Sequence, residues 1–183
     1  MNKTAFFIIL FLFAGTITSQ SKMYSFGASL GGGNISGRTP AIASLASEIF
    51  IQVEPPFLDQ VYFNLSYSHA RKIEYFLPEN KSSTYYPFFN IYSGALSLTQ
   101  PFYGRIMLEE SLGYTAINDK TFSTESNWAH GFDFSLFANF IPDSFYDGLV
   151  WSLGLRYGVT FSSHTANYFM MLFRVSHRFS YSH

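Results

Sequence analysis

The chain of 183 residues contains no cysteine, which excludes disulfide staples, thiolate metal sites, a cysteine nucleophile and a lipid-modified N-terminal cysteine. Charged residues make up only 13% of the chain, about half the usual share in a soluble domain. Eleven Lys and Arg against twelve Asp and Glu give a formal net charge of −1. The chain therefore has no basic field that would attract nucleic acid, and we expect no nucleic-acid partner.

Long hydrophobic runs are also missing. The strongly apolar core of the N-terminal segment, Ala5 to Phe13, has nine residues, whereas a helix needs about 20 to cross a bilayer. This stretch follows Lys3 and precedes small and polar residues up to Ser19, which is typical of a secretory signal peptide. We predict a cleaved signal peptide over residues 1–19, an exported domain over residues 20–183, and no transmembrane helix.

Aromatic residues are abundant, at 20% of the chain, and exclude a disordered protein. Many lie in segments where apolar and polar residues alternate with a period of two, the pattern of β-strands. In the clearest segment, residues 149–161, Trp151 and Leu153 share one face while Ser152 and Arg156 share the other. Gly94 marks a possible bulge in another segment. Eight strands are expected, over residues 23–31, 45–54, 61–68, 87–99, 104–115, 128–140, 149–161 and 169–181.

The connections between these segments alternate in length, which indicates an antiparallel meander with long loops at one end and both termini at the other. The long, polar connections are residues 32–44, 70–86 and 116–127; the short ones, each with a proline, are 55–59, 100–103 and 141–147; residues 163–167 form a shorter polar loop on the long-loop side. The predicted fold class is all-β: an eight-stranded antiparallel up-and-down transmembrane β-barrel.

The polarity of the two faces separates a membrane barrel from a soluble secreted barrel, the alternative architecture. A soluble barrel needs an apolar interior and a charged exterior. Charged residues are only 13% of this chain, which is too few to cover the outer surface of a barrel. We therefore assign the large apolar face to lipid and the small polar face to the lumen. Charges in a narrow lumen are expected to pair and fill it, or alternatively to line a narrow ion path. The proposed network comprises Glu48, Arg105, Glu109, Asp133, Arg156 and Arg174.

The aromatic residues are expected to form two belts, because rings with a polar edge concentrate at bilayer interfaces. The belt near the short turns comprises Phe57, Tyr62, Phe102, Tyr103, Phe140, Phe145, Tyr146, Phe179 and Tyr181; the belt near the long loops comprises Tyr85, Tyr86, Phe88, Tyr114, Trp128, Tyr157, Tyr168 and Phe169.

The export signal, the eight alternating segments and the alternating aromatics of the last strand (Phe173, Phe179 and Tyr181) resemble the small outer-membrane β-barrels of Gram-negative bacteria, the OmpA/OmpX-like group. The resemblance covers essentially the whole mature chain. It implies an outer-membrane location, contact with outer-membrane lipid and lipopolysaccharide, and recognition by the barrel-insertion machinery. In that family the final strand ends in an aromatic residue, whereas Tyr181 here lies two residues before the end.

One segment carries a candidate for catalysis. Ser162, Ser163 and His164, at the top of the seventh strand, resemble the Ser and His of the lipid A deacylases, which are also eight-stranded barrels. The last strand has no carboxylate to orient the histidine, so Glu48 or Asp133 would have to do so. A lipid A deacylase-like hydrolase is therefore the alternative function.

The favoured function is a non-enzymatic integral outer-membrane protein with a filled polar lumen. Its long external loops, above all residues 70–86, would serve envelope structure or surface contacts with a ligand that the sequence does not define. We expect no metal and no cofactor, because the five histidines lack the spacing of a metal site and Gly31 to Gly33 precede no Lys-Ser/Thr pair.

Overall fold

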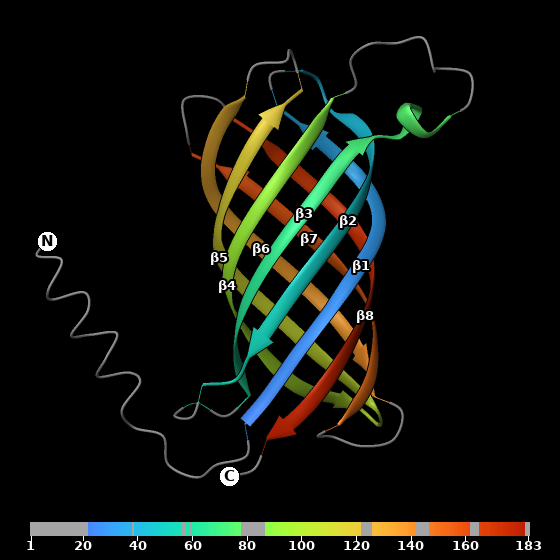
Figure 1. Ribbon diagram of the computed structural model, residues 1–183, viewed down its shortest axis with the longest axis vertical. Coiled ribbons are helices and arrows are strands. Elements are labelled where there is room, and N and C mark those ends of the chain that lie inside the picture. Colours follow the sequence, from blue (N-terminus) through green and yellow to red (C-terminus); the bar gives the residue numbers. More distant parts are fainter. Residues whose placement is uncertain are drawn as a thin grey trace, which may run out of the picture.

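The computed structural model describes residues 22–37, 39–55, 58, 60–77, 87–121, 126–141, 147–161 and 165–181. Within these residues, eight antiparallel strands close into one barrel in chain order, and β1 pairs with β8 (Figure 1). The predicted fold class is confirmed. The strands are β1 Lys22–Ser36, β2 Ile42–Val53, β3 Val61–Lys72, β4 Phe88–Tyr103, β5 Ile106–Lys120, β6 Asn127–Phe140, β7 Gly148–Thr160 and β8 Asn167–Tyr181, with one 3₁₀ turn, η1 Ile73–Phe76, after β3.

The register of the strands sets the tilt and the width of the barrel. A path along paired residues that starts at Tyr24 in β1 passes through all eight strands and returns to β1 at Asn34, ten residues further along. A stagger of this size corresponds to strands tilted by about 40° from the barrel axis. The inclination of the strands can be followed in Figure 1. Eight strands with this tilt leave an interior only wide enough for side chains.

The strands run further than the sequence alternation indicated. The β1–β2 and β5–β6 connections are therefore short, comprising only residues 37–41 and 121–126. At that end of the barrel only the β3–β4 connection, residues 73–87, is long. The prediction of three long loops was therefore wrong for the first and third of them. Backbone hydrogen bonds hold a ladder whether its side chains are polar or apolar, so a polar segment does not by itself end a strand.

The predicted bulge near Gly94 was also wrong. Gly94 pairs in continuous register with Leu65 on β3 and Tyr114 on β5. The irregularity lies instead between Pro101 and Tyr103, at the end of β4. Proline has no backbone N–H to donate to the ladder, which explains the position of the shift.

Burial alternates along every strand with large apolar residues on the outside. Ile49, Leu65 and Leu153 are 63%, 67% and 57% exposed, whereas Glu48 and Arg156 are 3% and 4% exposed. No helix in the described part of the chain is long and apolar enough to cross a bilayer. Most large apolar side chains thus face outward, and the deeply buried charged side chains face the lumen, the reverse of a soluble domain.

The predicted aromatic belts need two corrections. Tyr62 and Tyr168 are 8% and 2% exposed and point into the lumen, because each sits at an inward position of its strand. The exposed members include Phe102, Tyr103 and Phe140 at one end and Trp128 and Phe169 toward the other. Phe57, Tyr85, Tyr86, Phe145, Tyr146 and the side chain of Tyr181 lie outside the described residues.

Candidate functional site

The centre of the lumen is organised around Arg156, which β7 places at an inward position. Its guanidinium donates from Nε to both carboxylate oxygens of Asp133, at 3.1 and 3.0 Å, and its Nη2 binds Asp133 as well. Its Nη1 binds Glu48 of β2, which lies 108 positions earlier in the chain on the opposite wall. The remaining bonds of Arg156 go to hydroxyls of β3 and β4: Ser66 at 3.1 Å, Ser68 at 2.7 Å and Ser93 at 2.7 Å.

A second arginine links Glu48 to Glu109, a carboxylate nearer the short-turn end of the lumen. Arg174 of β8 donates to Glu109 at 3.0 Å and to Glu48 at 3.4 Å. Its guanidinium lies 4.2 Å from the ring centroid of Phe50 and 3.6 Å from that of Phe137. The two rings shield the cation from water and hold it in place, and their faces attract its charge. Arg174 thus joins the two carboxylates into one continuous network.

Glu109 and Glu48 each receive further hydrogen bonds from neutral side chains. Glu109 accepts from Gln52 Nε2 at 2.8 Å and from Asn139 Nδ2 at 2.9 Å. Glu48 accepts from Ser29 Oγ at 3.1 Å and from Ser68 Oγ at 2.9 Å. Buried carboxylates are tolerated when their lone pairs are satisfied in this way.

The charges at the centre of the lumen pair with one another. Glu48, Glu109 and Asp133 are bound by Arg156 and Arg174, and each of these residues is 4% exposed or less. Two further buried charges lie apart from them: Arg178, 5% exposed, at the short-turn end, and Asp119, 3% exposed, which accepts hydrogen bonds from Thr121 at the loop end. Uncompensated charges at this depth would be expensive, whereas a paired set with satisfied hydrogen bonds is stable. The arrangement favours a structural network that fills the lumen over an open ion path.

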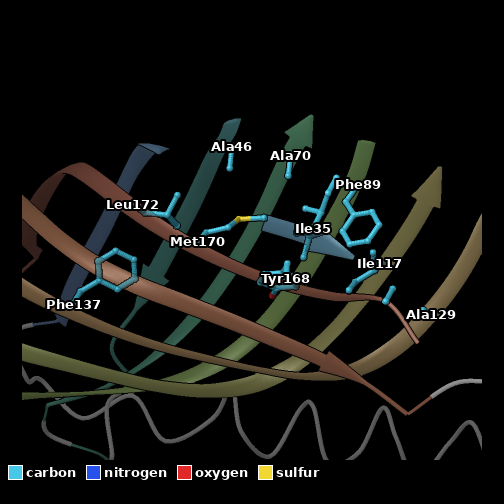
Figure 2. Packing of buried hydrophobic residues seen from close by; sticks show 12 residues of the cluster. Ile35, Ala46, Ala70, Phe89, Ile117, Ala129, Phe137, Tyr168, Met170 and Leu172 are labelled. Atoms are coloured by element: carbon cyan, nitrogen blue, oxygen red, sulfur yellow. The ribbon is translucent and has the colours of Figure 1, made fainter. Parts of the chain in front are cut away.

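Above the network, toward the loop end, a layer of apolar side chains fills the lumen. Tyr168 connects the two layers, since its ring centroid lies 5.8 Å from the Arg156 guanidinium carbon. Figure 2 shows these buried side chains inside the ring of strands. The apolar layer comprises Ile35, Ala46, Ala70, Phe89, Ile91, Ile117, Ala129, Ala166, Tyr168, Met170 and Leu172. The expected small polar face is therefore interrupted by a hydrophobic plug.

The opposite end of the lumen is polar and incompletely bonded. Arg178 is buried there and forms no ion pair with a described residue. Buried oxygens that lack a protein partner are normally bound by water, so we expect this end to be hydrated. The side-chain oxygens without a partner among the described residues here are those of Ser25, Asn64, Ser97, Thr99 and Ser152.

The structure brings together five of the six residues that the sequence analysis assigned to the lumen network. Glu48, Glu109, Asp133, Arg156 and Arg174 meet in the lumen network. Arg105 does not join them, because it lies exposed in the two-residue turn between β4 and β5, after Gly104 with a φ of 56°. A left-handed residue reverses the chain there, so the alternation of β5 does not extend back to Arg105.

The catalytic candidates Ser162, Ser163 and His164 lie outside the described residues. Glu48 and Asp133, the carboxylates that would have to orient His164, are both bound to Arg156 in mid-lumen. Sequence reasoning missed the neutral members of the network, Gln52 and Asn139 among them. Their inward phase was visible, but a polar residue at an inward position does not reveal its partner.

These features define a class of protein: a closed, eight-stranded antiparallel barrel with an apolar exterior and an ionic lumen. The chain matches no family model and no curated protein sequence. Its fold is that of small outer-membrane β-barrels of known structure, so the resemblance to the OmpA/OmpX-like group is confirmed at the level of the fold.

Three of these structures illustrate the likeness. Neisserial surface protein A is 8% identical, with a TM-score of 0.63 over 84% of this chain and 96% of that chain. Ail, the attachment invasion locus protein of Yersinia pestis, is 13% identical, with a TM-score of 0.56 over 88% and 100%. The N-terminal β-barrel domain of Pseudomonas aeruginosa OprF is 10% identical, with a TM-score of 0.54 over 88% and 100%.

Proposed function

We propose that this protein is an integral outer-membrane barrel without enzymatic activity, which reaches the membrane after removal of a signal peptide over residues 1–19. It contributes to envelope structure and to contacts at the cell surface through its loop end. The observation that carries the proposal is the reversed polarity of the barrel. An exterior of exposed leucine, isoleucine and aromatic side chains around a paired ionic interior is suited to lipid and unsuited to water.

The two tryptophans allow a direct test of lipid contact. Trp128 and Trp151 are the only tryptophans of the chain, they are 51% and 41% exposed, and they lie toward opposite ends of the barrel. In Trp128→Phe and Trp151→Phe variants refolded into vesicles, we expect blue-shifted emission and quenching by brominated lipids. Bromine near the headgroups should quench both indoles more than bromine near the chain ends, because both lie near an interface.

The control is the same pair of variants in urea, where brominated vesicles should have no effect. A soluble barrel would leave both indoles open to acrylamide and insensitive to lipid bromine in the folded state, and that result would refute the proposal.

The lumen network and the hydrophobic plug predict a barrel closed to ions. The apolar layer offers a hydrated ion no ligands, and the guanidinium groups below it are engaged by carboxylates. In planar bilayers, the folded protein is expected to add no stable conductance step. A 16-stranded porin in the same bilayer serves as the positive control, since its lumen is an aqueous channel. A stable, sizeable conductance would refute a filled lumen.

The β3–β4 connection is the part of the loop end best suited to surface contacts. Its described beginning exposes apolar side chains: Ile73 at 41%, Phe76 at 54% and Leu77 at 48%. Solvated apolar groups on a rigid barrel are a common basis for binding. They support a surface-contact role for this connection.

A further inference from the structure

A single carboxylate interrupts the apolar outer face of the strands. Within the eight described strands, Glu110 is the one Asp or Glu side chain that faces outward, and it is exposed. It pairs with Leu98 of β4 and with Leu136 of β6. It forms no hydrogen bond or ion pair with a described residue. An ionisable group on the lipid-facing side of a barrel is costly, so Glu110 indicates a site that meets a partner.

Glu110 lies in an open groove on the outer face of the barrel, with a volume of about 730 Å³. We call it the Glu110 groove. Around the carboxylate its walls are the apolar side chains of Val61, Leu98, Leu112, Phe134 and Leu136. A partner that fits this groove combines bulky apolar groups with one hydrogen-bond donor, because the carboxylate only accepts.

A cluster of three exposed rings with this chemistry lies on the outer face where β1 pairs with β8. The His177 ring centroid is 6.4 Å from that of Phe26 and 5.9 Å from that of Phe179, and the two phenylalanine centroids are 5.9 Å apart. His177 forms no hydrogen bond with a described residue. We call these three residues the His177 knob. It presents an imidazole N–H donor between two apolar rings.

The groove and the knob lie near the same end of the barrel. Glu110 is the fifth residue of β5 and His177 the fifth residue of β8, both counted from the short-turn end. The other outward basic side chains described in the strands lie toward the loop end; they are His69, Arg71, Lys120 and His130. Copies inserted from the same side of a membrane share one orientation, so only groups at similar depth meet. His177 is therefore the basic group that a second copy presents to Glu110.

We propose that copies of this barrel associate head to tail within the membrane. The His177 knob of one copy sits in the Glu110 groove of the next, and the imidazole donates a hydrogen bond to the carboxylate. This inference rests on the proposed membrane location, because acyl chains offer Glu110 no donor. A hydrogen-bonded pair between two membrane-embedded surfaces is favourable where the alternative is an unsatisfied polar group in lipid.

The positions of the two sites determine the kind of assembly. β5 and β8 are separated by β6 and β7 on one side of the barrel and by four strands on the other. A copy therefore cannot contact one neighbour through both sites at once. Contacts between two different faces repeat from copy to copy, so they build clusters larger than a dimer. Contact between two Glu110 grooves is disfavoured, since it would place two carboxylates together.

The test is complementation between two variants, followed by energy transfer in vesicles at low protein density. The chain has no cysteine, so Leu77→Cys at the loop end carries a donor or an acceptor dye away from both sites. Wild-type barrels should transfer energy above the level of random proximity. Glu110→Gln alone and His177→Gln alone should each weaken association on the order of tenfold. A mixture of the two variants should recover transfer, because the first keeps the knob and the second keeps the groove.

The matched control is His69→Gln, the same substitution at an outward histidine of the loop end, which should leave transfer unchanged. Absence of transfer between wild-type copies would overturn the proposal, and so would undiminished transfer in either single variant. A mixture that transfers no more than each variant alone would overturn the head-to-tail contact. None of these results touches the proposed function, which instead fails if the tryptophans do not contact lipid in vesicles.

Discussion

Replacing Arg156 with glutamine is expected to lower the free energy of unfolding of the barrel by about 3–5 kcal/mol. The substitution leaves Asp133 without its cation and Glu48 with only Arg174, in both cases deep in the lumen. A buried charge without a partner costs far more than the ion pair itself contributes. Urea unfolding in lipid vesicles, followed by tryptophan emission, measures the change.

Arg178→Gln provides the matched control. Arg178 is as buried as Arg156, at 5% against 4% exposure, yet it forms no ion pair with a described residue, so its loss should be much less destabilising. Adding Asp133→Asn to the Arg156→Gln variant should restore part of the lost stability, because it removes the carboxylate that the first substitution leaves uncompensated. Equal losses for the two arginine variants would contradict the network.

Replacing Gly33 with valine is expected to open the seam between β1 and β8. A Cβ at Gly33 would overlap the carbonyl oxygen of Phe169 and lie 2.7 Å from the Cα of Met170, both in the backbone of β8. A backbone strand does not rotate aside as a flexible side chain does, so the two strands must separate. We expect a loss of about 3 kcal/mol, the upper end of the usual range for overpacking. Heat-modifiable migration on gels and urea unfolding would report it.

The neighbouring Gly32 is the control for this seam. A Cβ there would meet its nearest atom, the Ser44 carbonyl oxygen, at 3.4 Å, which is ordinary contact. Gly32→Val should therefore change stability by less than about 1 kcal/mol, since valine suits a strand better than glycine does. If both variants have the same free energy of unfolding, steric overlap at Gly33 does not determine how well β1 pairs with β8.

The strand faces were predictable because they depend on local geometry. Successive side chains of a strand point to opposite sides, so the alternation of Trp151 and Leu153 with Ser152 and Arg156 already separated outside from inside. The same local rule failed where the chain turns. Arg105 was assigned to the lumen by extending the phase of β5 through a turn in which that phase no longer holds.

The candidate site was predictable only in its charged members. Glu48, Glu109, Asp133, Arg156 and Arg174 stand out because charge is rare at inward positions. The hydrophobic plug did not, since Ile91 lies in the segment with the expected bulge and Ile117 lies in residues 116–127, which were expected to form a polar connection rather than part of β5. Whether an inward apolar residue is buried by neighbours depends on what the other seven strands place at the same height.

The amino-acid sequence by itself determined that this chain forms eight antiparallel strands with an apolar outside and a polar inside, because period-two alternation and low charge are properties of neighbouring residues. Tertiary structure decided which charges meet. Glu48 and Arg156 lie 108 positions apart on opposite walls and come together because the ten-residue stagger of the closed sheet brings β2 and β7 to the same height. It likewise set Gly33 of β1 against the backbone of Met170 in β8, since only strand register sets which residues stand side by side.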